Sequence, residues 1–365
     1  MFVTILIFLA VLFVLILVHE WGHYITAKLT GMRVDEFAIG FPPKLFSWRK
    51  GETEYSLNAI PIGGFVRIYG EDPTQVAEAG PDSARAFGAR PKWAQAIVLV
   101  AGVTMNVVFA WFLFVVILLI GVPTQVEEGQ QTDAAVLTVM GVLPGSPADG
   151  AVPANVHITQ VSSGTETLEQ LTPSQVSDFI ATAVEPVVIR FSAQNVPVQT
   201  VTVMPQKGLI VASPDRAAIG ISLGLVETVS RPLVPALGEA VVRTIDTTEK
   251  IAIGLGGLLA AAVVGQADFS QVAGPVGIVN YVGDAAAVGF TSLLLFTAII
   301  SLNLAVVNLL PIPALDGGRL VFVAIETVLR RPIPPVWAAR VNLAGFAFLM
   351  LLMLAATIND ILKLW

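Results

Sequence analysis

The sequence contains no cysteine and only three histidines in 365 residues. Without cysteine, the chain can form no disulfide, no thiolate nucleophile and no cysteine-ligated zinc site. Any bound metal must therefore be held by His, Asp, Glu or Asn side chains. Charged residues are also scarce, at 13% against roughly 25% in soluble proteins, and 55% of the residues are hydrophobic. This composition predicts a membrane protein.

Four apolar stretches pass the length test of about 20 residues for crossing a bilayer. They are Phe2 to Val18 with its continuation towards Leu29, Ala94 to Val122, Phe290 to Leu310, and Trp337 to Ile361. The first has no basic n-region and no small-residue cleavage site, so it is interpreted as a retained span and not as a signal peptide. A further helical segment, Ser230 to Val264, has an apolar part too short to span, and we expect an interfacial helix or one packed against the rest of the protein.

Basic residues are unevenly distributed between the loops. Nine Lys and Arg lie between Lys28 and Lys92, whereas the much longer segment Pro123 to Gly289 has six against 15 Asp and Glu. Because basic loops stay in the cytoplasm, we expect that long segment and both chain ends outside it. The net charge of −7 gives no sign of nucleic-acid binding.

The segments between the spans predict two β-containing regions. Gly31 to Asp72 mixes alternating residues with Gly and Pro, which is typical of short strands and hairpins that here would dip into the membrane interface. Gln125 to Pro205 predicts several short strands with one or two helices, a small α+β domain. The expected fold is a polytopic α-helical membrane protein with about four transmembrane helices, a membrane-associated β-hairpin and the inserted domain. Its predicted parts are an N-terminal membrane part (1–122), the inserted domain (123–210), a linker with interfacial helices (211–289) and a C-terminal membrane part (290–365).

The first apolar run ends in LILVHEWGHYI, which contains the pattern H-E-x-x-H from His19 to His23. On a helix, positions i and i+4 share one face, so both imidazoles can reach one metal ion while Glu20 lies beside it. Zinc bound by two histidines needs a third protein ligand and leaves a position for water, whose pKa falls towards about 7. Glu20 can take the proton of that water as it attacks a peptide carbonyl and later deliver it to the leaving amine.

An accidental match on a helix surface is the alternative explanation of so short a pattern. At the end of a membrane span, however, three ionisable groups are costly unless they act together. The setting therefore favours a metal site.

A third metal ligand is expected in NLAVVNLLPIPALDGGRL, the segment Asn303 to Leu320. Pro311 and Pro313 cannot continue the preceding helix, and two glycines after Asp316 permit a tight turn. Asp316 is thus expected at a broken helix end on the cytoplasmic side. The histidines also lie on that side, so the two motifs can meet.

HEWGH together with NLLPIPALDGGR resembles the site-2 protease family of intramembrane metalloproteases. IGFPPKLF, ETEYSLNAIPIGGFVRI and GPVGI resemble its bacterial branch with an extracytoplasmic PDZ domain, so the similarity covers most of the chain. The resemblance implies a zinc endopeptidase of the bacterial inner membrane. It would cut transmembrane segments of single-span membrane proteins, such as anti-sigma factors or remnant signal peptides, within the lipid bilayer. The oligomeric state is left open.

The resemblance also implies roles for individual residues. His19, His23 and Asp316 would bind zinc, and Glu20 would be the general base. Asn308 would hold substrate or stabilise the developing oxyanion, and for this residue a helix–helix hydrogen bond is the alternative. For Asn303, that structural role is the favoured interpretation.

The hairpin of Asp35 to Arg67 would pair with an unwound substrate helix as an added strand. Gly63 and Gly64 would allow close backbone approach there, or would equally be turn glycines. The inserted domain resembles a PDZ module through LPGSPADGA, but DGAVPANVH stands where Ala-Gly-Leu and a Gly-Asp turn are expected. Peptide capture and a role as size filter or spacer both stay open, and Asp149 and His157 are interpreted as ordinary surface or core residues.

Other functions fit the sequence less well. No GxSG-like serine nucleophile and no GxGD motif is found, which disfavours serine and aspartyl intramembrane proteases. A zinc transporter would need polar residues along several spans. The alternative of a catalytically inactive membrane adaptor would tolerate loss of Glu20 or Asp316, and both residues are present.

Overall fold

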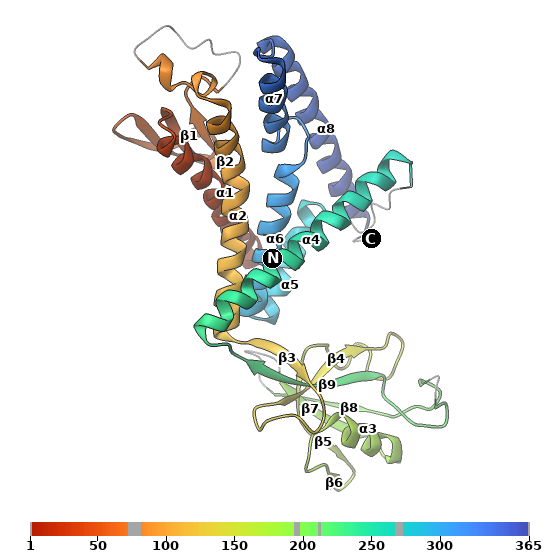
Figure 1. The fold of residues 1–365 in the computed structure, drawn as a ribbon. Helices are drawn as coiled ribbons and strands as arrows, with labels where there is room; N and C mark the ends of the chain where they lie inside the picture. The colour runs from red at the N-terminus through yellow and green to blue at the C-terminus, as the bar shows by residue number, and fades with distance from the viewer. Residues whose placement is uncertain (1, 72–81, 193–197, 211–212, 267–272, 364–365) are drawn as a thin grey trace. The chain divides into compact units, whose positions relative to one another are not determined.

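The computed structural model describes residues 2–71, 82–192, 198–210, 213–266 and 273–363. They form two compact units (Figure 1). The membrane unit comprises Met1–Val116 and Val234–Trp365, and the sheet unit comprises Ile117–Leu233.

Four described helices are long and apolar enough to cross a membrane. They are α1 (Phe2–Leu29), α2 (Lys92–Ile120), α6 (Phe290–Leu309) and α8 (Pro335–Leu362). The first and last residues of these four helices lie within two residues of the predicted ends of the spans. In the most apolar windows of α1 and α8 only 11% and 6% of residues are buried by protein. Lipid must cover the remaining apolar surface, and this confirms the prediction of a polytopic membrane protein.

Three further helices belong wholly or largely to the membrane unit: α4 (Leu233–Val263), α5 (Pro275–Val288) and α7 (Asp316–Leu329). The first matches the helix predicted over Ser230 to Val264. Helix α5 was not predicted from the sequence, although a proline in the first turn, here Pro275, is a common way to start a helix. The chain is not helical between Leu309 and Asp316, as the two prolines predict.

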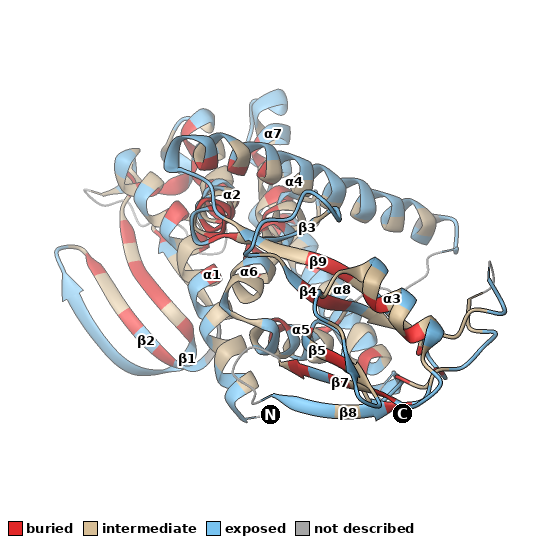
Figure 2. Ribbon diagram, turned by 90° about the horizontal axis from the view of Figure 1, so that it is seen from below, coloured by how far each residue is buried: buried red, intermediate tan, exposed pale blue. Residues whose placement is uncertain are grey.

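The predicted hairpin consists of β1 (Val34–Lys50) and β2 (Thr53–Ile68). Residues 36–39 are paired with 54–57 and also with 64–67. The strand β1 is mostly buried up to Gly40 and exposed from Phe41 onwards (Figure 2). Leu45, Phe46 and Trp48 are more than half exposed in this outer part. Such an apolar outer edge fits the membrane interface predicted for the hairpin.

A buried apolar cluster connects the hairpin to the helices. It joins the end of α1, the base of the hairpin, the short 3₁₀ helix η2 (Phe87–Ala89), the start of α2 and one residue of α7. Its members are Ala27, Met32, Val34, Ile68, Phe87, Ala94, Val98, Leu99 and Val323. A second 3₁₀ turn, η1 (Ser83–Arg85), precedes η2. Because Val323 lies two turns after Asp316, this packing holds the start of α7 close to α1 and α2.

The sheet unit contains β3 (Val122–Val126), β4 (Val136–Val142), β5 (His157–Ser163), β6 (Glu166–Thr167), α3 (Pro173–Thr182), β7 (Val187–Ser192), β8 (Gln199–Val203) and β9 (Ile221–Val229). The strand order is β3-β9-β4-β5-β7-β8, with β6 paired to β5. The predicted boundary at 210 falls inside this unit, because β9 pairs between β3 and β4. The core of the sheet unit is apolar and includes Val139, Val161, Ile189 and Phe191.

Candidate metal centre

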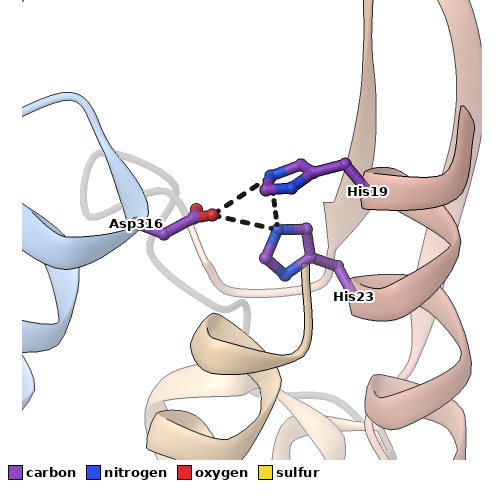
Figure 3. A group of neighbouring side chains, drawn as sticks. All are labelled: His19, His23 and Asp316. Carbon is purple, nitrogen blue, oxygen red and sulfur yellow. Dashed lines mark hydrogen bonds and ion pairs between the residues drawn. The ribbon is translucent and has the colours of Figure 1, made fainter. Parts of the chain in front are cut away.

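Three side chains from α1 and α7 converge on one point of the membrane unit. His19 and His23 project from the same face of α1, and Asp316 is the first residue of α7 (Figure 3). The Nε2 atoms of His19 and His23 lie 3.1 Å and 3.3 Å from Oδ2 of Asp316. The two Nε2 atoms are 3.2 Å apart. Both histidines are buried, so the structure brings together the three ligands that the sequence predicts.

The spacing of these three atoms fits a zinc ion. Atoms bound to zinc at about 2.1 Å with tetrahedral angles lie about 3.4 Å from one another, close to the separations of 3.1–3.3 Å seen here. Among the described residues, none donates a hydrogen bond of good geometry to the buried Oδ2 of Asp316. A cation between the three atoms would compensate this buried charge, and the fourth tetrahedral position would stay open for water or substrate.

The charge of Asp316 suits a metal ligand. Burial opposes ionisation of this carboxyl, but the neighbouring His19 and His23 outweigh burial and hold its pKa below the ordinary value.

Helix α2 provides polar partners for the far sides of both imidazoles. Nδ1 of His23 lies 2.8 Å from the backbone oxygen of Val98, and Nδ1 of His19 lies 3.2 Å from the side-chain amide of Asn106. Asn106 is fully buried. Asn106 was not predicted as a site residue, although a polar residue inside the apolar span from Ala94 to Val122 is a signal of function.

Glycines allow the two helices to approach each other. An added Cβ at Gly102 of α2 would meet Nε2 of His23, and it would lie 2.7 Å from Cε1 of His19. On the facing helix, an added Cβ at Gly22 would lie against the backbone of Ala101. The imidazoles thus occupy the space that a side chain at position 102 would fill.

Two ion pairs link α7 to the N-terminal half of the membrane unit. Arg319 is paired with Glu71 at 2.6 Å, and Glu326 is paired with Lys92 at 2.5 Å. Together with the packing of Val323 they hold Asp316 against the histidines, although hundreds of residues separate the motifs in sequence.

Glu20 and Gly64 lie next to each other. An added Cβ at Gly64 would lie 3.4 Å from Cγ of Glu20 and 3.1 Å from a methyl carbon of Ile16. Gly63 has a φ of +116°, which favours glycine for backbone reasons alone. Of the two predicted glycines, Gly64 is therefore the one that the structure brings to Glu20.

The two predicted asparagines belong to α6. Asn303 is exposed, and its amide donates to the backbone oxygen of Ile299 in the same helix at 2.9 Å. This contact lies within one helix and is not the helix–helix hydrogen bond favoured for Asn303, so its role stays a prediction. Asn308 is half-buried in the last turn of α6, eight residues before Asp316, and its predicted role in substrate binding stays a prediction.

Asp149 and His157 lie outside this centre, in the sheet unit. The Asp149 carboxylate accepts a hydrogen bond from the backbone of Gly145, and His157 is hydrogen-bonded to Thr138. Both contacts are local, as expected for ordinary structural residues.

Comparison with known proteins identifies the family. The sequence pattern of peptidase family M50 matches residues 7–352, nearly the whole chain. The chain belongs to peptidase family M50, the site-2 protease family. Among the relatives of this M50 peptidase, the zinc metalloprotease RasP of Oceanobacillus iheyensis is 32% identical over 447 aligned residues, covering 99% of each chain. The regulator of sigma-W protease RasP of Bacillus subtilis is 29% identical, again over 99% of each chain. The protein is a zinc metalloprotease, as the H-E-x-x-H pattern predicts.

Proposed function

We propose that this zinc metalloprotease cuts peptide bonds inside the transmembrane segments of other membrane proteins. The observation that carries the proposal is the meeting of His19, His23 and Asp316 within the membrane unit. The two histidines belong to α1, a helix apolar enough to span a bilayer. A metal centre built on such a helix is accessible to peptide bonds that lie in the lipid, where soluble proteases do not reach.

In this proposal His19, His23 and Asp316 hold the zinc ion, and Glu20 is the general base. Zinc bound there supplies Lewis-acid activation of water and of the substrate carbonyl. Glu20 takes the proton from the attacking water and delivers it to the leaving amine. Asn308, with Asn303 as the weaker candidate, would hold the substrate or stabilise the negative charge that develops on the carbonyl oxygen.

The hairpin would bind the substrate as an added strand. A helix must open before its peptide bonds can be attacked, and a free strand edge can replace the lost hydrogen bonds. Residues 64–67 are paired with 36–39, and the described sheet shows no second partner for them. Since Gly64 lies beside Glu20, a substrate strand added at this edge would pass close to the general base.

The sheet unit would be an extracytoplasmic PDZ-like domain, and the metal centre would lie near the cytoplasmic side of a bacterial inner membrane. The loop charges support this orientation. A cavity of about 430 Å³ between α3 and the start of β9 is lined by Leu143, Ile180, Ile219, Ile221 and Leu223. This apolar lining favours capture of a peptide, with a size filter as the alternative. Substrates would be single-span proteins such as anti-sigma factors or remnant signal peptides.

The proposal is tested with the full chain and its Glu20→Gln variant, each expressed with a panel of tagged single-span proteins. We expect uncut substrate to accumulate with the variant alone, with a loss of roughly 10²–10⁴-fold in cleavage rate and an unchanged zinc content. Mass spectrometry of the products locates the cut. Cleavage within the apolar segment supports intramembrane proteolysis, whereas cleavage only in exposed loops overturns it.

A further inference from the structure

The polar contacts of α2 with the two histidines carry an inference beyond the ligand set. A histidine that binds a metal through Nε2 keeps its proton on Nδ1, and that N–H needs an acceptor to fix the ring. In this centre the Nε2 atoms of both histidines face Asp316, so a metal ion held between these atoms requires both Nδ1 atoms to be donors.

For His23 the acceptor is unambiguous. Its Nδ1 lies 2.8 Å from the backbone oxygen of Val98, and a carbonyl oxygen can only accept. This contact fixes the proton on Nδ1 and leaves the lone pair of Nε2 free for a metal ion.

For His19 the partner is the side-chain amide of Asn106, and here the amide nitrogen is placed towards Nδ1 at 3.2 Å. That orientation would put the proton of His19 on Nε2, where it would block metal binding. Oxygen and nitrogen of an amide are assigned from their surroundings. Turning the amide by 180° exchanges the positions of its oxygen and nitrogen. The amide atom that faces away from His19, now Oδ1, has no partner among the described residues, so one buried amide atom stays unpaired in either orientation. The chemistry of the ligand therefore decides the orientation.

We propose that the side-chain oxygen of Asn106 accepts the Nδ1–H of His19 and is a positioning group of the zinc centre. The inference rests on the ligand set proposed above. Asn106 occupies the same face of α2 as Val98 and Gly102, since the three positions are four residues apart. One face of α2 thus fixes both imidazole tautomers and leaves room for the rings at its middle position. The hydroxyl of Ser301 donates to the backbone oxygen of Asn106 at 2.8 Å and attaches α6 to the same face.

Zinc dissociation constants of the full chain in detergent micelles, measured by competition with a chromophoric chelator, test this role. Asn106→Leu keeps the size of the side chain but removes the acceptor, and we expect zinc affinity to fall about 10–100-fold. Asn106→Asp keeps an acceptor and cannot donate, so we expect its affinity to equal or exceed that of the wild type. Thr104→Val is the matched control on α2, because the hydroxyl of Thr104 donates to Val100 in its own helix, and it should leave the affinity unchanged.

The two Asn106 variants together support or overturn the acceptor role. Loss in Asn106→Leu with retention in Asn106→Asp supports the acceptor role, whereas wild-type affinity in Asn106→Leu, or loss in both variants, overturns it. Thermal unfolding of the metal-free proteins shows whether a variant is folded, and Asn106→Ala replaces Asn106→Leu with the same expectation if the latter is not. His19→Ala separates the two proposals: if it leaves zinc binding intact, the ligand set itself is wrong.

Discussion

Both units of this protease have buried apolar clusters, but they differ in the polar side chains that they bury. The core of the sheet unit is apolar, and Thr138 and Ser146 are the polar residues buried beside it. In the membrane unit the buried groups include His19, Asn106 and Asp360, while much of the apolar surface of α1 and α8 is exposed. A lipid solvent explains the difference, since apolar side chains gain little from leaving lipid. Removing apolar groups should therefore affect the sheet unit most, and removing polar groups the membrane unit.

The largest effect on stability is expected from Phe191→Ala in the sheet unit. Phe191 is 2% exposed within the apolar core, and its truncation removes a buried ring and leaves a cavity, at a cost of roughly 3–5 kcal/mol. Pulse proteolysis of the full chain in urea, following cleavage within 117–233, measures the loss. Zinc affinity should not change. Val184→Ala is the control, because Val184 is 87% exposed; an equal loss in both variants would contradict the role assigned to the core.

Asp360→Ala tests the effect of removing a buried polar group from the membrane unit. The buried carboxylate of Asp360 on α8 accepts hydrogen bonds from the backbone N–H groups of Gly274 and Gly277 at the start of α5. Truncation leaves both donors without an acceptor and should cost roughly 2–3 kcal/mol. Unfolding of the full chain in mixed micelles, followed by tryptophan fluorescence, measures this cost. Asp360→Asn retains one acceptor and should lose less. Thr357→Val should be nearly neutral, because the hydroxyl of Thr357 donates to Met353 in its own helix. Equal stability of Asp360→Ala and wild type would refute the capping role.

The sequence predicted those features that depend on local spacing. The spans follow from run length, and the shared face of His19 and His23 follows from helix periodicity. Asp316 could be chosen because few acidic residues stand in an apolar context. The place of β9 in the sheet depends on pairing between distant segments, which no local pattern encodes. Likewise, Gly102 and Asn106 contact the histidines only because α2 packs against α1, which no local pattern encodes. A lone asparagine in a span could still have been predicted as a functional residue.

Gly102→Ala tests how closely α2 must approach the histidines. The added methyl group would lie 2.7 Å from Cε1 of His19 and 2.8 Å from Cε1 of His23, so the rings must shift. We expect zinc affinity to fall roughly tenfold, which corresponds to about 1.4 kcal/mol, in the same competition assay. Gly238→Ala on α4 is the matched control, since its added Cβ would have no described atom within 4 Å other than those of its chain neighbours and of its own helix backbone. Unchanged zinc affinity in Gly102→Ala would show that α1 and α2 can move apart enough to accommodate a methyl group at this position.

The smallest effect is expected from an ion-pair cluster at the turn between β1 and β2. Hydrogen bonds from Arg85 and Lys28 lower the pKa of Glu52 from 4.5 to about 2. Because the folded state lowers this pKa, the stabilisation is complete above about pH 4.5 and is lost as the pH falls towards 2. The side chains are partly exposed, so the contribution is at most about 1 kcal/mol. Glu52→Gln should lower stability by this amount at neutral pH and flatten the pH dependence of unfolding between pH 4.5 and 2. A steeper dependence of unfolding on pH in the variant would contradict the assignment. High salt should reduce the difference in stability between the two proteins, because salt screens charges near water. It should affect the buried contacts of the metal centre much less.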